Sequence, residues 1–280
     1  MIVEFKNFTK LLFKGLNYSK YFKKNNFDKL LGIDIKNFSN ISKKNIKDPY
    51  SNVKTSKDAF APELDDLCRL HYLAISRKVT TILEFGVGQS TLVLNDALEK
   101  NKSKYLKYVN KNLRRSNPFE CHSVDNNEFW IKRIKNNYNL NRTIFYKTVV
   151  NMGTFNDRVC TFYKNLPNIC PDLIYLDAPD LSSIKGSIRG ITTNHSDRLP
   201  MSADILSIEH FLLPGTLIVI DGRTANARFL KSNLQRNWIY CHDELADQHF
   251  FELSEPPLGI YNRLQINYCL GNLYYKRLIQ

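Results

Sequence analysis

The sequence lacks any long uninterrupted apolar run. The longest candidates, such as the segment from Leu217 to Ile220, have the length of a strand and fall far short of the roughly 20 residues of a membrane-spanning helix. The N-terminal stretch MIVEFKNFTKLLFKGL alternates lysines with apolar residues and lacks an apolar segment that ends in a small-residue cleavage site. We therefore expect a cytoplasmic protein without a membrane span.

Paired cysteines are also missing. The six cysteines are scattered singly, with no C-x-x-C pair and no Cys/His cluster at zinc spacing, so we expect reduced structural thiols. Charged residues make up 24% of the chain and apolar residues 43%, which excludes the low-hydrophobicity composition of a disordered protein. A chain of 280 residues can hold one large α/β domain with appendages, or two small domains.

Acidic residues are scarce in two segments. Residues 1–60 carry an excess of eight positive charges, and residues 101–118, which contain no acid, carry six, whereas the whole chain carries +13. The rest of the chain is therefore almost neutral. Both segments are also rich in Asn, and joint enrichment in Lys and Asn is what an A/T-biased coding sequence would produce without any partner. Contact of these segments with RNA or another polyanion is the alternative interpretation.

From Leu64 onward, strand patterns alternate with helix patterns. A helix is predicted from Leu64, with His71 as a packed core residue on its apolar face. Strands are predicted at 80–85, 119–124, 143–150, 173–176 and 216–220, and helices at 90–100, 127–137, 202–212 and 225–234. This alternation predicts parallel β-α-β units in a doubly wound, mostly parallel sheet.

The two ends of the chain depart from this pattern. Three strand-like runs, at 238–242, 249–253 and 266–270, have no long helix between them, which predicts an antiparallel C-terminal edge. Residues 1–60 show no sustained period and are interpreted as a basic N-terminal extension made of short helices or an extended arm. The main domain is therefore expected to cover residues 61–280.

The first β-α turn reads ILEFGVGQST, in which a strand and an acid precede G-x-G and a helix start. Gly86 and Gly88 permit a tight turn and close approach of a ligand, and Ser90 could cap the helix or bind that ligand. A dinucleotide site would place a third glycine where Thr91 stands. The Glu84 carboxylate would also repel a pyrophosphate but suits a ligand with an ammonium and a sulfonium. These residues favour S-adenosylmethionine over NAD.

This turn resembles the first motif of class I S-adenosylmethionine-dependent methyltransferases, which have a Rossmann-like fold. The resemblance covers roughly residues 64–234 and implies that Asp125, at the end of ECHSVD, binds the ribose hydroxyls. It also implies that Asp177, in PDLIYLDAP, lies near the transferred methyl group and that Asp221, in GTLIVIDGR, stands at the neighbouring strand end. Asp125 follows Gly86 by 39 residues, where about 20 is usual in dinucleotide folds, so residues 101–118 are expected to form an inserted loop.

Methyl transfer requires alignment of the two reactants and removal of a proton from the acceptor. The long loop after the fourth strand contains Asp180, His195 and Asp197, and His195 is the first candidate for the base because its ordinary pKa suits proton transfer near neutrality. A solvated histidine without a role is the alternative. Asp177 and Asp221 could instead hold Mg²⁺ as in catechol-type O-methyltransferases, but Gly222 follows Asp221 where that family has Asn, which favours a metal-free site.

The sequence thus predicts methyl transfer from S-adenosylmethionine to a small-molecule or sugar acceptor. The catalytic candidates are Asp177, His195 and Asp221, and the cofactor candidates are Glu84, Gly86, Gly88, Ser90 and Asp125. One alternative is a non-catalytic Rossmann-like module that contacts RNA or a polyanion through its basic segments. An NAD-linked oxidoreductase is disfavoured by Glu84 and Thr91.

Overall fold

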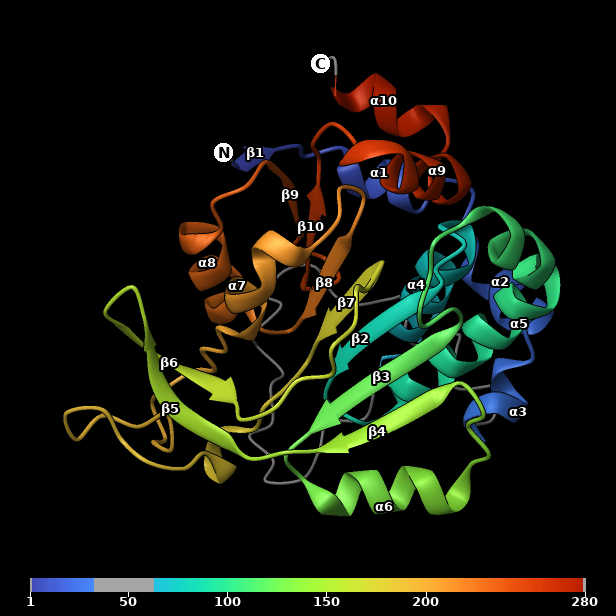
Figure 1. The fold of residues 1–280 in the computed structure, drawn as a ribbon. Helices are drawn as coiled ribbons and strands as arrows, with labels where there is room; N and C mark the ends of the chain where they lie inside the picture. The colour runs from blue at the N-terminus through green and yellow to red at the C-terminus, as the bar shows by residue number, and fades with distance from the viewer. Residues whose placement is uncertain (1, 33–62, 279–280) are drawn as a thin grey trace.

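The computed structural model describes residues 2–32 and 63–278, which form a large mixed sheet covered by helices (Figure 1). The eight strands of the sheet lie in the order β1-β9-β10-β8-β7-β2-β3-β4. In chain order they are β1 (Ile2–Glu4), β2 (Thr81–Phe85), β3 (Glu120–Asp125), β4 (Thr143–Lys147), β7 (Leu173–Leu176), β8 (Leu217–Asp221), β9 (Trp238–Asp243) and β10 (Gln248–Leu253). A separate antiparallel hairpin consists of β5 (Val150–Phe155) and β6 (Arg158–Tyr163).

The sheet is mostly parallel, as the alternation of strands and helices predicts. β4, β3, β2, β7 and β8 run parallel to one another, whereas β10 is antiparallel to both of its neighbours, β8 and β9. The predicted antiparallel C-terminal edge is thereby confirmed for β9 and β10. The chain passes from β2 outward to β3 and β4, then crosses back to β7 and β8 on the other side of β2.

Helices lie on both faces of this sheet (Figure 1). They are α1 (Phe8–Leu12), α2 (Tyr18–Lys24), α3 (Phe27–Leu31), α4 (Leu64–Ser76), α5 (Gln89–Asn112), α6 (Glu128–Asn137), α7 (Asp204–Ile208), α8 (Thr224–Asn233), α9 (Gly259–Cys269) and α10 (Asn272–Leu278). Within residues 2–32 and 63–278, no helix has the length and apolar character needed to cross a membrane. The cytoplasmic location stays a prediction.

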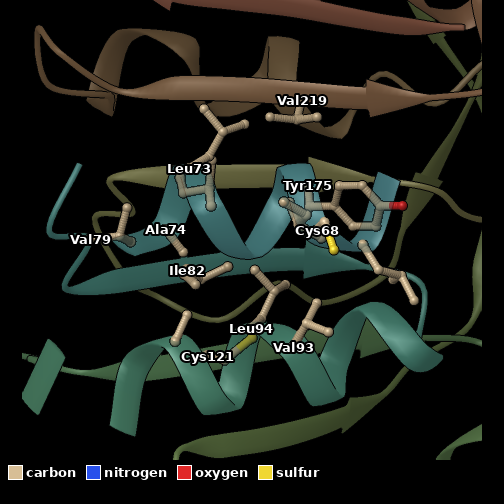
Figure 2. Packing of buried hydrophobic residues seen from close by; sticks show 14 of the residues in the cluster. Cys68, Leu73, Ala74, Val79, Ile82, Val93, Leu94, Cys121, Tyr175 and Val219 are labelled. Atoms are coloured by element: carbon tan, nitrogen blue, oxygen red, sulfur yellow. The ribbon is translucent and has the colours of Figure 1, made fainter. Parts of the chain in front are cut away.

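Alternating side chains of the central strands enter two different cores. Ile82, Tyr175 and Val219 join the core under α4 and α5, which Figure 2 shows at close range. Their neighbours Leu83 and Ile218 face the opposite core, under α7 and α8. Both faces of the central strands are therefore buried, which explains their nearly continuous apolar sequences.

The loop expected at residues 101–118 is wrong for most of its length, because α5 continues to Asn112. The basic stretch is helical because its apolar residues recur near helical spacing. Val109 is fully buried against Phe119 and Tyr268, and Tyr105 and Leu106 pack partly against the same cluster. Most of the lysines between them are exposed. These charged residues made the apolar helical spacing hard to recognise in the sequence.

Two predicted strands also differ from the structure. Residues 266–270 belong mainly to α9, not to a strand, and Ile266 and Tyr268 are buried on that helix. The segment predicted as one strand at 143–150 ends at Lys147, and Val150 begins the hairpin of β5 and β6, which the sequence analysis missed. An apolar run of this length satisfies strand and helix patterns alike.

The described N-terminal residues pack directly on the domain body. β1 pairs in parallel with β9, and Phe8, Phe22 and Phe27 are buried in the core that contains α4 and α5. His71 is confirmed as a core residue, because its imidazole is fully buried and hydrogen-bonds the Tyr21 hydroxyl at 2.7 Å. The domain boundary expected after residue 60 falls outside the described residues and stays a prediction.

Candidate functional site

The carboxyl ends of β2, β3, β7 and β8 meet at one edge of the sheet. The order of connections reverses between β2 and β7, because the chain builds β3 and β4 on one side of β2 and β7 and β8 on the other. In open α/β sheets a ligand typically binds in the crevice outside such a reversal point. The turn that follows β2 and the aspartates that follow β3, β7 and β8 therefore share the edge where a ligand is expected.

The turn after β2 places its two glycines in different surroundings. Gly86 has a φ of +104°, and a Cβ at this position would lie 3.1 Å from the Asp177 carbonyl oxygen and from the Ala178 Cβ. Gly88 has extended backbone with a φ of −166°, and a Cβ there would meet nothing within 4 Å. The turn thus needs glycine at 86 to close against the β7 loop, whereas Gly88 leaves open space above the start of α5.

Glu84 lies behind this turn and is fully buried. Its carboxylate accepts hydrogen bonds from the hydroxyls of Ser90 at 2.7 Å, Thr91 at 2.8 Å and Ser123 at 2.5 Å. Burial raises the pKa of Glu84 to about 7, against the opposing effect of these three hydrogen bonds. The carboxylate holds the first turn of α5 against β3, so its effect on a ligand would pass through the position of the glycine turn.

Asp125, at the end of β3, hydrogen-bonds the backbone of the same turn. One carboxylate oxygen accepts from the Val87 amide at 2.8 Å and the other from the Asn127 amide at 2.7 Å. Burial raises the pKa of Asp125, although these backbone hydrogen bonds oppose the rise. Each carboxylate oxygen has a further lone pair with which to accept a ligand hydroxyl.

Asp177 follows β7 and pairs with Arg223, which precedes α8. The Arg223 Nε lies 3.2 Å from the Asp177 Oδ1, and the same guanidinium donates to the carbonyl oxygens of Asp177 at 2.7 Å and Pro179 at 3.0 Å. The Asp177 side chain remains 53% exposed. Arg223 therefore fixes the loop after β7 while leaving the aspartate open to solvent at the edge.

Asp221, at the end of β8, accepts a hydrogen bond from the Tyr175 hydroxyl at 2.8 Å. Burial and repulsion from Asp177 raise its pKa. Asp66, in the first turn of α4, is nearly buried, and its pKa is raised by burial and by repulsion from Asp221. The carboxyl groups of Asp66, Asp65 and Glu63 also offer ligand atoms within 4.8 Å of one another. This part of the edge is rich in carboxyl groups and would attract a cation.

His195 is exposed on the loop between β7 and α7, and its bonds remain within that loop. Its Nδ1 accepts from the Asp197 amide at 3.2 Å, and its own amide donates to the Thr193 carbonyl oxygen at 2.8 Å. Two backbone hydrogen bonds connect this loop to the hairpin of β5 and β6. The Met152 amide donates to the Lys185 carbonyl oxygen, and the Thr161 amide donates to the Met201 carbonyl oxygen. The structure thus brings together the turn after β2 and the three strand-end aspartates, and the hydrogen bonds of His195 in the described residues reach none of them.

Sequence reasoning missed Tyr163, at the end of β6. The residue is buried, with 5% of its surface exposed, and its hydroxyl has no hydrogen-bond partner in the described chain. The hydroxyl lies within electrostatic range of four charged side chains, those of Asp125, Asp204, Arg223 and Asp180, so a polar group at the candidate site has no protein partner. A buried hydroxyl of this kind usually has a partner such as a ligand or water. Only the unanticipated hairpin brings Tyr163 to this edge, so no local sequence signal indicated it.

Comparisons with known proteins add little to this geometry. No family model and no curated protein matches the chain. A similar solved structure is the SAH-bound methyltransferase PaMTH1 of Podospora anserina, which is 13% identical, with 70% of this chain and 80% of that chain covered and a TM-score of 0.39.

Proposed function

We propose that this chain is an S-adenosylmethionine-dependent methyltransferase of the Rossmann-like class I fold. The observation that carries the proposal is the glycine turn at the reversal point of the sheet, with open space at Gly88 and the Asp125 carboxylate beside it. Asp125 would accept hydrogen bonds from the two ribose hydroxyls. The unpartnered Tyr163 hydroxyl supports a polar ligand at the same place.

The charge of the edge favours this ligand over a dinucleotide. Four carboxyl groups lie at this edge, one each from the ends of β3 and β8, the loop after β7 and the start of α4: Asp125, Asp221, Asp177 and Asp66. The one nearby cation named above, Arg223, is already paired with Asp177. A pyrophosphate would be repelled by these carboxyl groups, whereas a ligand with ammonium and sulfonium groups would be attracted. When bound, S-adenosylmethionine would supply an electrophilic methyl group. The acceptor is proposed to be a small molecule or a sugar.

In this mechanism the chain mainly orients the reactants. The acceptor would take the methyl group from the sulfur, leaving S-adenosylhomocysteine, and would lose its proton to a base supplied by the chain. Asp177 is exposed at the edge and would position the acceptor, together with Asp221. His195 stays the proposed base, on the long loop that begins at Asp177. A metal-free site is favoured because Arg223 and the Tyr175 hydroxyl already bond Asp177 and Asp221.

Binding of S-adenosylhomocysteine tests the proposal directly. Calorimetry is expected to show one site with a dissociation constant on the order of micromolar. Asp125→Ala should weaken binding at least tenfold because the ribose hydroxyls lose their acceptor. Asp125→Asn keeps one side-chain oxygen that can accept from the Val87 amide of the turn. This variant therefore distinguishes loss of the negative charge from loss of the turn's structure.

Asp157→Asn, at the exposed turn between β5 and β6, serves as the matched control and should bind like the unaltered protein. Binding of NAD tighter than binding of S-adenosylhomocysteine would overturn the proposal. So would unchanged affinity of both Asp125 variants.

A further inference from the structure

The hairpin of β9 and β10 places two histidines and an aspartate on one of its faces. His242 in β9 and His249 in β10 are direct cross-strand partners, and such partners project their side chains to the same side. Asp247 lies in the turn just before β10 and has a positive φ of 47°. The strand register therefore brings the two histidines together, and the turn adds Asp247 beside them.

The side chains converge closely enough to share one ion. One ligand atom from each of His242, Asp247 and His249 lies within 4.8 Å of the others. The two imidazole rings are stacked, with centroids 3.9 Å apart. The His242 Nε2 is buried without a hydrogen-bond partner and stands 3.7 Å from the Asp247 Oδ1, which is too far for a hydrogen bond. A nitrogen lone pair or N–H is thus left unsatisfied at the centre of the cluster.

The surroundings of His249 suit a metal ligand. Its Nδ1 lies 2.9 Å from the Tyr240 hydroxyl and its Nε2 lies 3.0 Å from the Thr224 hydroxyl. If Nδ1–H donates to the Tyr240 oxygen, which is an outer hydrogen bond typical of metal-bound histidines, Nε2 is an acceptor toward the Thr224 hydroxyl. That hydroxyl also lies 3.2 Å from the Asp247 Oδ1 and has one proton to donate, so a bound ion would take its place at Nε2.

We propose that His242, Asp247 and His249 form a binding site for Zn²⁺ or a similar divalent transition-metal ion. Two imidazoles and one carboxylate are a ligand set that such ions prefer over Mg²⁺ or Ca²⁺. Because the rings are stacked, binding requires the half-buried His242 ring to tilt toward the shared ion. The Asp247 carbonyl oxygen accepts from the Gly222 amide at 3.0 Å, so the ion would also fix the backbone directly after Asp221.

Zinc titration of the full-length protein, first dialysed against a chelator, tests the site. Calorimetry is expected to show one Zn²⁺ per chain, and His242→Ala and Asp247→Asn should each weaken binding at least tenfold. Both side chains are partly exposed, so circular dichroism should show that these variants keep the fold. His210→Ala, which removes an exposed histidine that lies outside the cluster, should bind zinc like the unaltered protein.

Co²⁺ binding can be followed by absorption spectroscopy, which is independent of the calorimetric measurement. Co²⁺ at the site is expected to give the intense visible absorption of a four-coordinate ion with nitrogen ligands, and Zn²⁺ should displace it. The proposal is overturned if neither ion binds, if His242→Ala binds Zn²⁺ as tightly as the unaltered protein, or if His210→Ala causes the same loss.

Discussion

At the scale of single residues, Gly86 and Gly88 differ in what surrounds them. The φ of +104° at Gly86 is unfavourable for other residues, and an added Cβ would press on Asp177 and Ala178. We expect Gly86→Ala to lower the free energy of unfolding by about 1–3 kcal/mol. Gly88→Ala should change it by less than about 0.5 kcal/mol, because a Cβ there meets open space and ordinary backbone.

The variants Gly86→Ala and Gly88→Ala also distinguish an effect on stability from an effect on ligand binding. Gly88→Ala should weaken S-adenosylhomocysteine binding in spite of its intact stability, because the new Cβ would occupy the space of the proposed cofactor. Urea denaturation and calorimetry of both variants check this expectation. Full binding by Gly88→Ala would place the ligand elsewhere.

Glu84 gives a prediction about pH. Its pKa is raised to about 7 in the folded protein, above the ordinary value near 4.3, so the folded state binds the proton more tightly. This contribution to stability is complete at low pH and is lost as the pH rises from about 4.3 to about 7. Over that window Glu84 should lower the free energy of unfolding by up to about 1.4 kcal/mol per pH unit.

The variant Glu84→Gln isolates this contribution, because every other titrating group stays in place. Denaturation by urea between pH 5 and pH 7.5 should show a flatter pH dependence in Glu84→Gln than in the unaltered protein. Equal slopes would mean that Glu84 is ionised throughout this range and that its three hydroxyl donors outweigh burial.

Residues of the candidate site could be predicted from the sequence only where they follow a strand. Asp125, Asp177 and Asp221 each end an apolar run, so the parallel order of the strands brings them to one edge. Tyr163 and Asp66 reach that edge through the hairpin and through the start of α4, which no local pattern connects with it. Proximity created by tertiary structure left no signal in the sequence.

At the scale of elements, the central strands were predictable because their apolar runs are buried on both faces. The second half of α5 and all of α9 were not, because each buries only a narrow apolar stripe among polar side chains. For residues 1–60 the sequence left short helices and an extended arm open, and the described part forms the short helices α1 to α3, whose buried phenylalanines join the main core. Periodicity is a weak guide where a helix has only two turns.

The N-terminal helices are expected to stabilise the domain body. Phe27 is fully buried, and its ring centroid lies 5.2 Å from that of His71 on α4. We expect Phe27→Ala to lower the free energy of unfolding by about 3–5 kcal/mol. Leu11→Ala, on the exposed side of α1, should have little effect and serves as the control. Equal stability of the two variants in urea would show that these helices are dispensable.

At the scale of the whole molecule, charge is separated along α5. The helix begins beside the acidic edge and extends 24 residues, about 36 Å at the usual rise, so its lysine-rich end lies far from the candidate site. The Lys100 ammonium donates to the Asn25 side chain at 3.1 Å, which places the lysines of α2 close to α5. Among the described residues, the lysines of α2 therefore lie near the middle of α5, whereas Lys107 and Lys111 lie toward its C-terminal end.

This arrangement makes the polyanion interpretation testable apart from the cofactor. If the basic end binds single-stranded RNA, anisotropy with labelled poly(U) should show an affinity that falls steeply with salt. Replacing Lys107 and Lys111 by Gln should then reduce the slope of log K against log salt by roughly 1.4, since each charge contributes about 0.7 on single strands. The same change at Lys132 and Lys135 on α6 is the matched control, and neither variant should alter S-adenosylhomocysteine binding. If the unaltered protein binds no RNA at low salt, or both variants lose the same slope, the lysines have no nucleic-acid partner at this end, and coding bias is a sufficient explanation for them.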